Sequence, residues 1–332
     1  MISVAMTTYN GEKYVEKQLI SLLNQTCLPD EVIIVDDGSS DSTCRIVDNF
    51  IKDYGLNDRW KLIRCEENRG HLNSFFEAIS LVAGDIIFLC DQDDIWLPQK
   101  IELMSNLMIE NPNIQALSSS FNKIDSYGHS IKSYENFLSS NNGIIRKRIK
   151  SGEIVKISPF TLITYNVSPG CTSAFRKETK DIFINKLGKV DDFALVHDWK
   201  INLIAALNDG LYFVNTPTIL YRLHSENTLG LSRNFDIESR ISAYENAKKE
   251  RITMYRISEY IEYGNSDDIY RKSINEYFEK MIKSYEERQE NLKKGNLLGC
   301  FKTIFKFNLF VNRAFESVLV DIIAIINKKR LK

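Results

Sequence analysis

Ile86-Ile87-Phe88-Leu89-Cys90-Asp91-Gln92-Asp93-Asp94 is the stretch of sequence that decides the fold. Its first five residues are apolar and predict a strand buried on both faces, as in a parallel sheet. The three carboxylates that follow repel one another and lose hydration, so they need a cation or hydrogen-bond donors. Because open α/β sheets bind ligands at the carboxyl ends of their strands, the stretch predicts a metal-assisted phosphate site. In the alternative, the aspartates only form a turn or cap a helix.

The first 110 or so residues repeat one unit of strand, polar turn and helix. Apolar strands are expected at Ile2–Met6, Glu31–Val35 and Trp60–Cys65, ahead of the strand at Ile86–Cys90. Between them, apolar residues recur at helical spacing. The pattern predicts an α/β fold with a doubly wound, mostly parallel sheet, in which right-handed crossovers bring the polar strand ends to one edge.

Composition excludes several classes of protein. The chain has 332 residues, of which 43% are hydrophobic and 26% charged, as in a globular protein with a full core. A net charge of −1 gives no support for a nucleic-acid partner. The six cysteines form no CxxC pair, which argues against a zinc knuckle or a disulfide framework and suits a reducing cytoplasm. We expect neither a signal peptide nor a membrane span, and the late apolar run from Val318 to Ile326 is interrupted by Asp321.

A second polar turn, Asp36-Asp37-Gly38-Ser39, follows the second expected strand. Its carboxylates can accept hydrogen bonds from a base or a ribose, and its backbone offers N–H groups. The chain lacks both GxGxxG and GxxxxGK[ST] here, which excludes a dinucleotide fingerprint and a P-loop. A plain turn that caps the next helix remains equally open.

His224 and Arg222 are candidates for the same site. A neutral imidazole at His224 could complete a divalent metal site with Asp93 or Asp91, although a surface histidine fits the spacing as well. In an extended segment Arg222 would point to the same face, where its guanidinium could clamp a diphosphate.

The tripeptide His197-Asp198-Trp199 offers a carboxylate beside an aromatic wall, which suits a general base for a sugar hydroxyl. A helix follows it in the sequence pattern, so Asp198 could equally be an N-cap residue.

Several segments together resemble the family-2 inverting glycosyltransferases, which have the GT-A fold, and in particular their bacterial rhamnosyltransferase-like branch. They are MTTYNGEKYVEKQLISLLNQT, IIVDDGSSDST, NRG, GDIIFLCDQDDIW, GCTSAF, HDW and YRLHSEN. The resemblance covers roughly residues 1 to 230. It implies a catalytic domain over 1–235, with a nucleotide-binding half at 1–110 and an acceptor and base half at 111–235. A helical C-terminal region would occupy 236–332.

The resemblance also implies a role for each site residue. Asp198 matches the general base, and Asp93, Asp94 and His224 match the positions that hold Mg²⁺ or Mn²⁺. Gly170-Cys171 matches the floor beneath the donor sugar. The nucleotide and its diphosphate would be held by Thr7, Tyr9, Asp37, Asn68, Arg69, Asp91 and Arg222.

The expected function is therefore transfer of a sugar, with inversion, from a nucleoside-diphosphate sugar to a glycan or a lipid-linked acceptor in cell-surface polysaccharide synthesis. dTDP-rhamnose is the first donor to test, on family analogy alone. Two alternatives are a metal-dependent sugar-phosphate nucleotidyltransferase and a non-catalytic nucleotide-sugar-binding protein. The first would carry a glycine-rich basic loop after the first strand, whereas this chain has Thr7-Thr8-Tyr9-Asn10-Gly11 there.

The C-terminal stretch from Leu297, LLGCFKTIFKFNLFVNRAF, mixes apolar and basic residues at helical spacing. Such a helix either lies on the anionic inner face of the cell membrane or packs against the catalytic domain with its lysines in solvent. Both interpretations stay open from the sequence.

Overall fold

The structure is a computed structural model. It describes residues 1–132, 140–142, 144–145, 147–187, 195–224, 236–261, 268–309 and 315–330. The chain divides into two compact units, one of residues 1–157 and 167–227 and the other of residues 158–166 and 228–332. Across the described ranges, every helix falls short of the length and apolarity needed to cross a bilayer.

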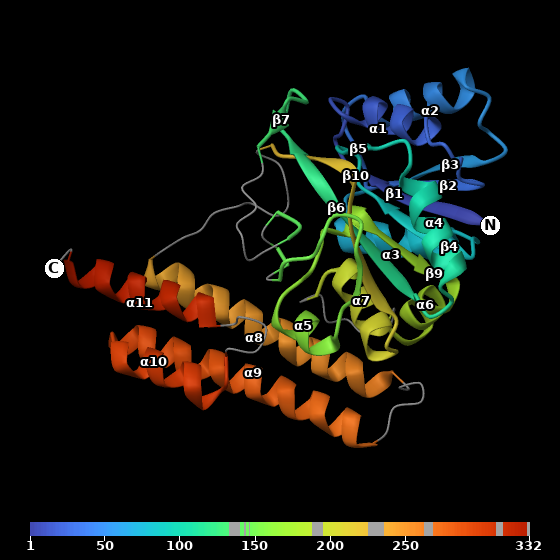
Figure 1. Cartoon of the computed structure of the whole chain (residues 1–332). Helices are drawn as coiled ribbons and strands as arrows, with labels where there is room; N and C mark the ends of the chain where they lie inside the picture. Colours follow the sequence, from blue (N-terminus) through green and yellow to red (C-terminus); the bar gives the residue numbers. More distant parts are fainter. Residues whose placement is uncertain are drawn as a thin grey trace. The chain divides into compact units, whose positions relative to one another are not determined.

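Four parallel strands form one half of the sheet in the first unit, in the order β3-β2-β1-β4 (Figure 1). They are β1 (Ile2–Thr8), β2 (Glu31–Asp36), β3 (Trp60–Arg64) and β4 (Ile86–Cys90). The helices that connect them are α1 (Val15–Leu23), α2 (Thr43–Asp53) and α3 (His71–Leu81). The α/β fold expected from the repeated strand–turn–helix unit is therefore confirmed.

The other half of the sheet is mixed. A long parallel pair, β6 (Ala116–Ile124) and β10 (Leu211–Arg222), is joined to β4 by the antiparallel strand β9 (Ser173–Arg176). Since an antiparallel strand begins where its neighbours end, β9 brings the turn η1 (Gly170–Thr172) to the carboxyl end of β4. The short strands β5 (Ile95–Trp96), β7 (Ser130–Ile131) and β8 (Ile154–Lys156) complete the ten strands found in the described residues.

Helices cover both faces of the sheet. On one face, Met6, Ile34 and Phe88 share a buried apolar cluster with Leu19 of α1 and Met104 of α4 (Lys100–Glu110). On the other face, α3 packs on β1 and β2, while α7 (His197–Leu207) packs on β6, β10 and α3. Alternate residues of each strand thus enter different cores, which explains the continuous apolar strands of the sequence. The remaining helices of the unit are α4 (Lys100–Glu110), α6 (Lys177–Ile182) with the π-helical turn Phe183–Leu187, and α7 (His197–Leu207).

The second unit is helical, as the sequence predicts for the C-terminal residues (Figure 1). Its helices are α5 (Pro159–Thr164), α8 (Ile237–Tyr260), α9 (Asp268–Lys294), α10 (Leu297–Lys306) and α11 (Phe315–Arg330). The amphipathic stretch from Leu297 is helical as far as Lys306, and its residues 310–314 lie outside the described residues. The sequence gives no signal that α5, which precedes β9, belongs with these helices.

A buried acidic group ties three of these helices together. The fully buried carboxylate of Asp321 on α11 accepts hydrogen bonds from Arg240 Nε (3.0 Å) and the Tyr244 hydroxyl (2.7 Å) of α8. It also accepts one from Arg288 Nε (2.9 Å) of α9. Because a buried carboxylate is costly without such partners, these donors explain why Asp321 can interrupt the apolar run from Val318 to Ile326.

Candidate active site

The carboxylates of Asp91–Asp94 follow β4 directly, at the carboxyl edge of the sheet. Asp93 Oδ2 lies 2.7 Å from His224 Nε2, so these two predicted metal ligands meet. Asp94 is buried behind them, and its Oδ1 accepts a hydrogen bond from the Arg222 backbone N–H (2.9 Å). Asp94 Oδ2 is also buried and accepts no hydrogen bond from the described residues. The structure therefore brings Asp93 and His224 together, whereas Asp94 contacts the backbone of Arg222 and groups with Asp91 and Cys171.

The cluster is electrostatically strained. Burial, and then the charges of Asp93 and Asp198, raise the pKa of Asp91 to about 7. Burial, and then the charges of Asp93 and Asp91, hold the pKa of Asp94 well above its usual range. Carboxylate oxygens and an imidazole are ligands that divalent cations accept, and the buried Asp94 Oδ2 has no donor of its own. The residues present therefore fit a bound Mg²⁺ or Mn²⁺.

The thiol of Cys171 lies against this cluster. One ligand atom each from Cys171, Asp91 and Asp94 lie within 4.8 Å of one another. Burial, reinforced by the two carboxylates, raises the pKa of the thiol well above its usual range, so it stays protonated. A neutral thiol is a poor ligand for a hard cation but can donate a hydrogen bond to a carboxylate. Without a cation, the Cys171 thiol is therefore a neutral group beside Asp91 and Asp94.

Lys100 is a component of the site that the sequence analysis missed. This residue at the start of α4 is fully buried, and its Nζ donates a hydrogen bond to the Cys171 carbonyl. Nζ also lies 3.8 Å from the centroid of the Trp96 ring, a cation–π contact. Burial lowers the pKa of Lys100 to about 8, so near neutral pH its ammonium group is still charged. It lies next to the residues Asp91–Asp94, which we call the acidic loop. The sequence shows only a lysine after a Trp-Leu-Pro turn, where an exposed residue would be expected.

Asp198 lies in the first turn of α7, and it is 7% exposed. Its Oδ1 accepts a hydrogen bond from the Trp199 N–H (2.7 Å). Its Oδ2 would lie 3.4 Å from a Cβ placed on Gly170. The charge of Asp198 also raises the pKa of Asp91, so the two carboxylates lie close together. The predicted base therefore lies beside both the turn at Gly170 and the acidic loop.

Arg222, predicted to clamp a diphosphate, is fully buried at the end of β10. Its guanidinium donates hydrogen bonds to the carbonyls of Asp93 (2.7 Å) and Asp125 (3.2 Å). The guanidinium carbon also lies 4.8 Å from the ring centroid of Tyr14, which stacks on His224 at 5.0 Å. Arg222 thus positions the acidic loop, and its role toward a diphosphate stays a prediction.

Gln92 links the acidic loop to the loop after β1. Its side-chain Oε1 accepts a hydrogen bond from the Tyr9 N–H, and its Nε2 donates one to the Tyr9 carbonyl, both at 2.9 Å. A Cβ on Gly11 would stand 2.0 Å from Gln92 Oε1, so only a glycine leaves room for this pairing. The side chain of Tyr9 is 44% exposed, as suits a residue that contacts a ligand.

The two aspartates after β2 have different partners. Asp36 accepts hydrogen bonds from the hydroxyls of Thr8 (2.7 Å) and Ser39 (2.6 Å), so it stabilises the turn. Asp37 is 3% exposed, and its Oδ1 accepts a hydrogen bond from the Arg69 N–H (2.9 Å). The structure therefore joins the predicted nucleotide residues Asp37 and Arg69 through the backbone of the latter.

The remaining predicted nucleotide residues lie on neighbouring elements. Asn68 Oδ1 accepts a hydrogen bond from the Gly70 N–H (3.0 Å) and so shapes the loop before α3. Thr7 is half-buried in β1, in register with Val35 of β2. Among its described contacts it has no side-chain hydrogen bond to the other predicted residues, and its place near the base stays a prediction.

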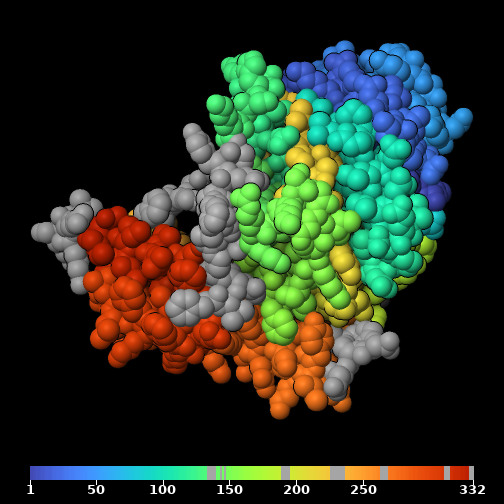
Figure 2. Space-filling view, viewed as in Figure 1, coloured from blue at the N-terminus to red at the C-terminus, as the bar shows by residue number. Residues whose placement is uncertain are grey.

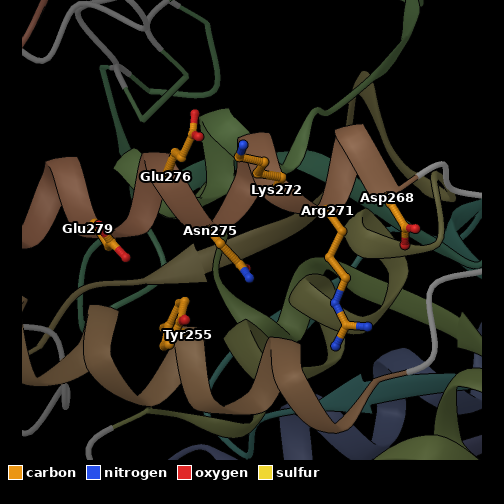
Figure 3. Close-up of a pocket in the computed structure, with 7 residues that line it drawn as sticks. All are labelled: Tyr255, Asp268, Arg271, Lys272, Asn275, Glu276 and Glu279. Atoms are coloured by element: carbon orange, nitrogen blue, oxygen red, sulfur yellow. The ribbon is translucent and has the colours of Figure 1, made fainter.

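A separate hollow of about 520 Å³ lies between α8 and α9 of the second unit (Figure 3). It is lined by Tyr255 of α8 and, from α9, by Asp268, Arg271, Lys272, Asn275, Glu276 and Glu279. Its charged side chains are of both signs and mostly exposed, so it offers no concentrated field for a ligand.

A parallel-sheet edge with clustered carboxylates is an arrangement that can hold a metal ion and a phosphorylated ligand. A family model described as Glycosyl transferase family 2 matches residues 3–177, and the chain belongs to this family. The resemblance inferred from the motifs is confirmed. The chain is therefore a glycosyltransferase, and the nucleotidyltransferase and non-catalytic alternatives are set aside.

Curated relatives include a dTDP-rhamnosyl transferase, RfbG, of Shigella flexneri, which is 27% identical over 69% of this chain and 75% of its own length. Another is the UDP-Glc:alpha-D-GlcNAc-diphosphoundecaprenol beta-1,3-glucosyltransferase WfgD of Escherichia coli, 26% identical over 71% of this chain and 85% of its own. Among solved structures, S. aureus TarS 1–349 aligns with a TM-score of 0.59 at 16% identity over 99% of this chain and 91% of that chain. The mannosyltransferase PcManGT of Pyrobaculum calidifontis aligns with a TM-score of 0.54 at 16% identity, over 98% of this chain and 86% of that chain. These structures support the GT-A fold.

Proposed function

We propose that this chain transfers a sugar from a nucleoside-diphosphate sugar to a hydroxyl of a glycan or lipid-linked acceptor, in a single displacement that inverts the anomeric centre. Asp198 is the general base that takes the proton of the attacking hydroxyl. This carboxylate is needed because an alcohol is a weak nucleophile at its own pKa.

One observation carries the proposal: Asp198 Oδ2 faces Gly170, beside the acidic loop. A side chain at Gly170 would begin 3.1 Å from Asp198 Cβ and 3.4 Å from Oδ2, so the glycine keeps this turn clear of the carboxylate. Asp91 is close enough to Asp198 for the two charges to interact. A donor bound along the loop after β4 would therefore present its sugar near the base.

Asp93, Asp94 and His224 would hold the divalent cation. When bound, such a cation supplies positive charge to the leaving diphosphate. The chain's own residues do the rest of the positioning. Arg222 fixes the Asp93 backbone, and Lys100 fixes the Cys171 carbonyl beneath the donor sugar.

The donor is proposed to be dTDP-rhamnose, because a relative named as a dTDP-rhamnosyl transferase covers 69% of the chain. A relative named for UDP-Glc makes UDP-glucose the competing candidate. A thermal-shift screen of nucleotide sugars with Mn²⁺ separates the two. The chain is further proposed to work in the cytoplasm, which suits its six free cysteines.

The test of the base is Asp198→Asn, with Asp181→Asn on the exposed face of α6 as the matched control. We expect Asp198→Asn to abolish transfer while donor affinity by calorimetry stays within several-fold. The control should keep full activity, and NMR of the product should show an inverted anomeric centre. Loss of donor binding in Asp198→Asn would instead assign this residue to the donor site.

A further inference from the structure

Two neighbouring helices of the second unit expose apolar side chains. In the described residues, 18 large apolar side chains are markedly exposed, and six of these belong to α10 and α11. These six, which we call the α10–α11 apolar face, are Leu298 (64% exposed), Phe301 (46%), Phe305 (71%), Leu319 (43%), Ile323 (45%) and Ile326 (36%). Their concentration on two short helices is unusual, because exposed apolar residues on soluble proteins are normally scattered.

Each helix already has a separate buried side. On α10 it consists of Cys300, Thr303 and Ile304, and on α11 it includes Val318 and Ile325. The exposed residues therefore lie on sides that the helices do not need for packing within their own unit. The space-filling view shows α10 and α11, in red, at the surface of their own unit (Figure 2).

The stretch of chain that contains α10 and α11 also carries a net positive charge. From Leu297 to the end there are seven lysines and arginines and two acidic residues, a net charge of +5. The whole chain has a net charge of −1, so residues 1–296 carry −6. Lys302 of α10 and Lys328 of α11 are exposed, and Lys306 forms an ion pair with Glu287.

We propose that the α10–α11 apolar face docks on the surface of an anionic lipid bilayer. An apolar helix side flanked by lysines combines the two attractions that hold a peripheral protein at such a surface, burial of apolar area and charge. A second copy that docked through the same face would bring its own stretch of net charge +5 against this one, and like charges repel. Lipid is therefore the occupant that the charge favours.

The experiment uses the full chain and co-sedimentation with vesicles, with no donor or acceptor added. Vesicles of phosphatidylcholine alone are compared with vesicles rich in phosphatidylglycerol. The variant Phe301→Ser/Phe305→Ser removes two aromatic side chains of the apolar face. Ile109→Ser is the matched control, because Ile109 is 64% exposed on α4, in the other unit.

We expect binding to the phosphatidylglycerol vesicles that falls with added salt and is much weaker without the anionic lipid. The double variant should bind at least about tenfold more weakly, whereas the Ile109→Ser control should bind like the parent. Unchanged binding by the double variant, or equal binding to both vesicles, overturns the proposal. So does a concentration-dependent dimer in lipid-free solution that the double variant abolishes, because the face would then belong to a second copy. Vesicle binding is measured without catalysis, so failure here is distinct from failure of the proposed transferase activity.

Discussion

Replacing Gly11 with alanine tests whether Gln92 holds the loop after β1 in place for the nucleotide. Gly11 does not adopt a positive φ, so alanine can take up the same backbone conformation. The added Cβ would stand 2.0 Å from Gln92 Oε1. The side chain of Gln92 is more flexible than the backbone at Gly11. The Gln92 side chain should therefore move away and lose its two hydrogen bonds to Tyr9.

The expected loss follows from those two bonds. A neutral hydrogen bond contributes about 0.5–1.5 kcal/mol, and the partly solvated position of Gln92 favours the lower part of this range. The pair is therefore worth about 1–2 kcal/mol. If the nucleotide binds only to the ordered loop, the affinity of Gly11→Ala should fall by up to roughly 5- to 30-fold.

A double-mutant cycle isolates the contact. Gln92→Ala removes the same two bonds, so we expect the same loss of affinity from it. In the Gln92→Ala background, Gly11→Ala should then cost nothing further, and the coupling energy should be about 1–2 kcal/mol. The assay is calorimetry with the nucleoside diphosphate that most stabilises the parent enzyme. Gln99→Ala, at an exposed position before α4, is the control.

Additive losses in the cycle would refute the reasoning, because they would mean that Gly11 and Gln92 act independently. Normal affinity in both single variants would show that the Tyr9 pairing does not order the nucleotide loop. A fall in the denaturant midpoint as large as that of a core variant would assign the effect to folding.

Three further variants test other parts of the site. Asp93→Ala should remove metal-dependent nucleotide binding; parent-like calorimetric affinity that EDTA does not change would contradict the metal site. Lys100→Met should lower the free energy of unfolding by about 1–3 kcal/mol, because it leaves the buried Cys171 carbonyl without its hydrogen-bond donor; an unchanged urea midpoint would show that this hydrogen bond does not stabilise the fold. His197 stacks on Phe75 with ring centroids 3.9 Å apart, and burial, helped by the charges of His71 and Lys200, lowers its pKa to about 3. Below pH 6.5 the imidazole of His197 is therefore protonated in the unfolded chain but stays neutral in the native chain. The free energy of unfolding should fall by roughly 1.4 kcal/mol per pH unit between pH 6 and pH 4. His197→Phe should remove that share of the slope in urea titrations, and an unchanged slope would count against a neutral buried imidazole.

Much of the nucleotide half could be predicted from the sequence, because its signals are local. Strands such as Ile86–Cys90 are continuous apolar runs, and the polar turns after them contain aspartates. In a parallel sheet these turns must gather at one edge. The pairing of Asp93 with His224 agrees with the predicted cluster, although they are 131 residues apart.

The place of the antiparallel strand β9 in the sheet could not be predicted from such local signals. Nothing in Ser173–Arg176 specifies that it enters between β4 and β6, since its pairing depends on partners far away in the chain. Yet this insertion brings Gly170 to the end of β4 and so to Asp198.

The sequence by itself determined the order of strands and helices and the kinds of functional group at the strand ends, because hydrophobic period and turn chemistry act over a few residues. Only the tertiary structure decided which groups meet. It buried Lys100 beneath the acidic loop, paired Gln92 with Tyr9 and made Arg222 a support of the Asp93 backbone. The physical reason is that burial and hydrogen-bond geometry are properties of segments brought together from distant parts of the chain. A lysine, a glutamine or an arginine has the same appearance in the sequence whether it is exposed to solvent or enclosed in such a site.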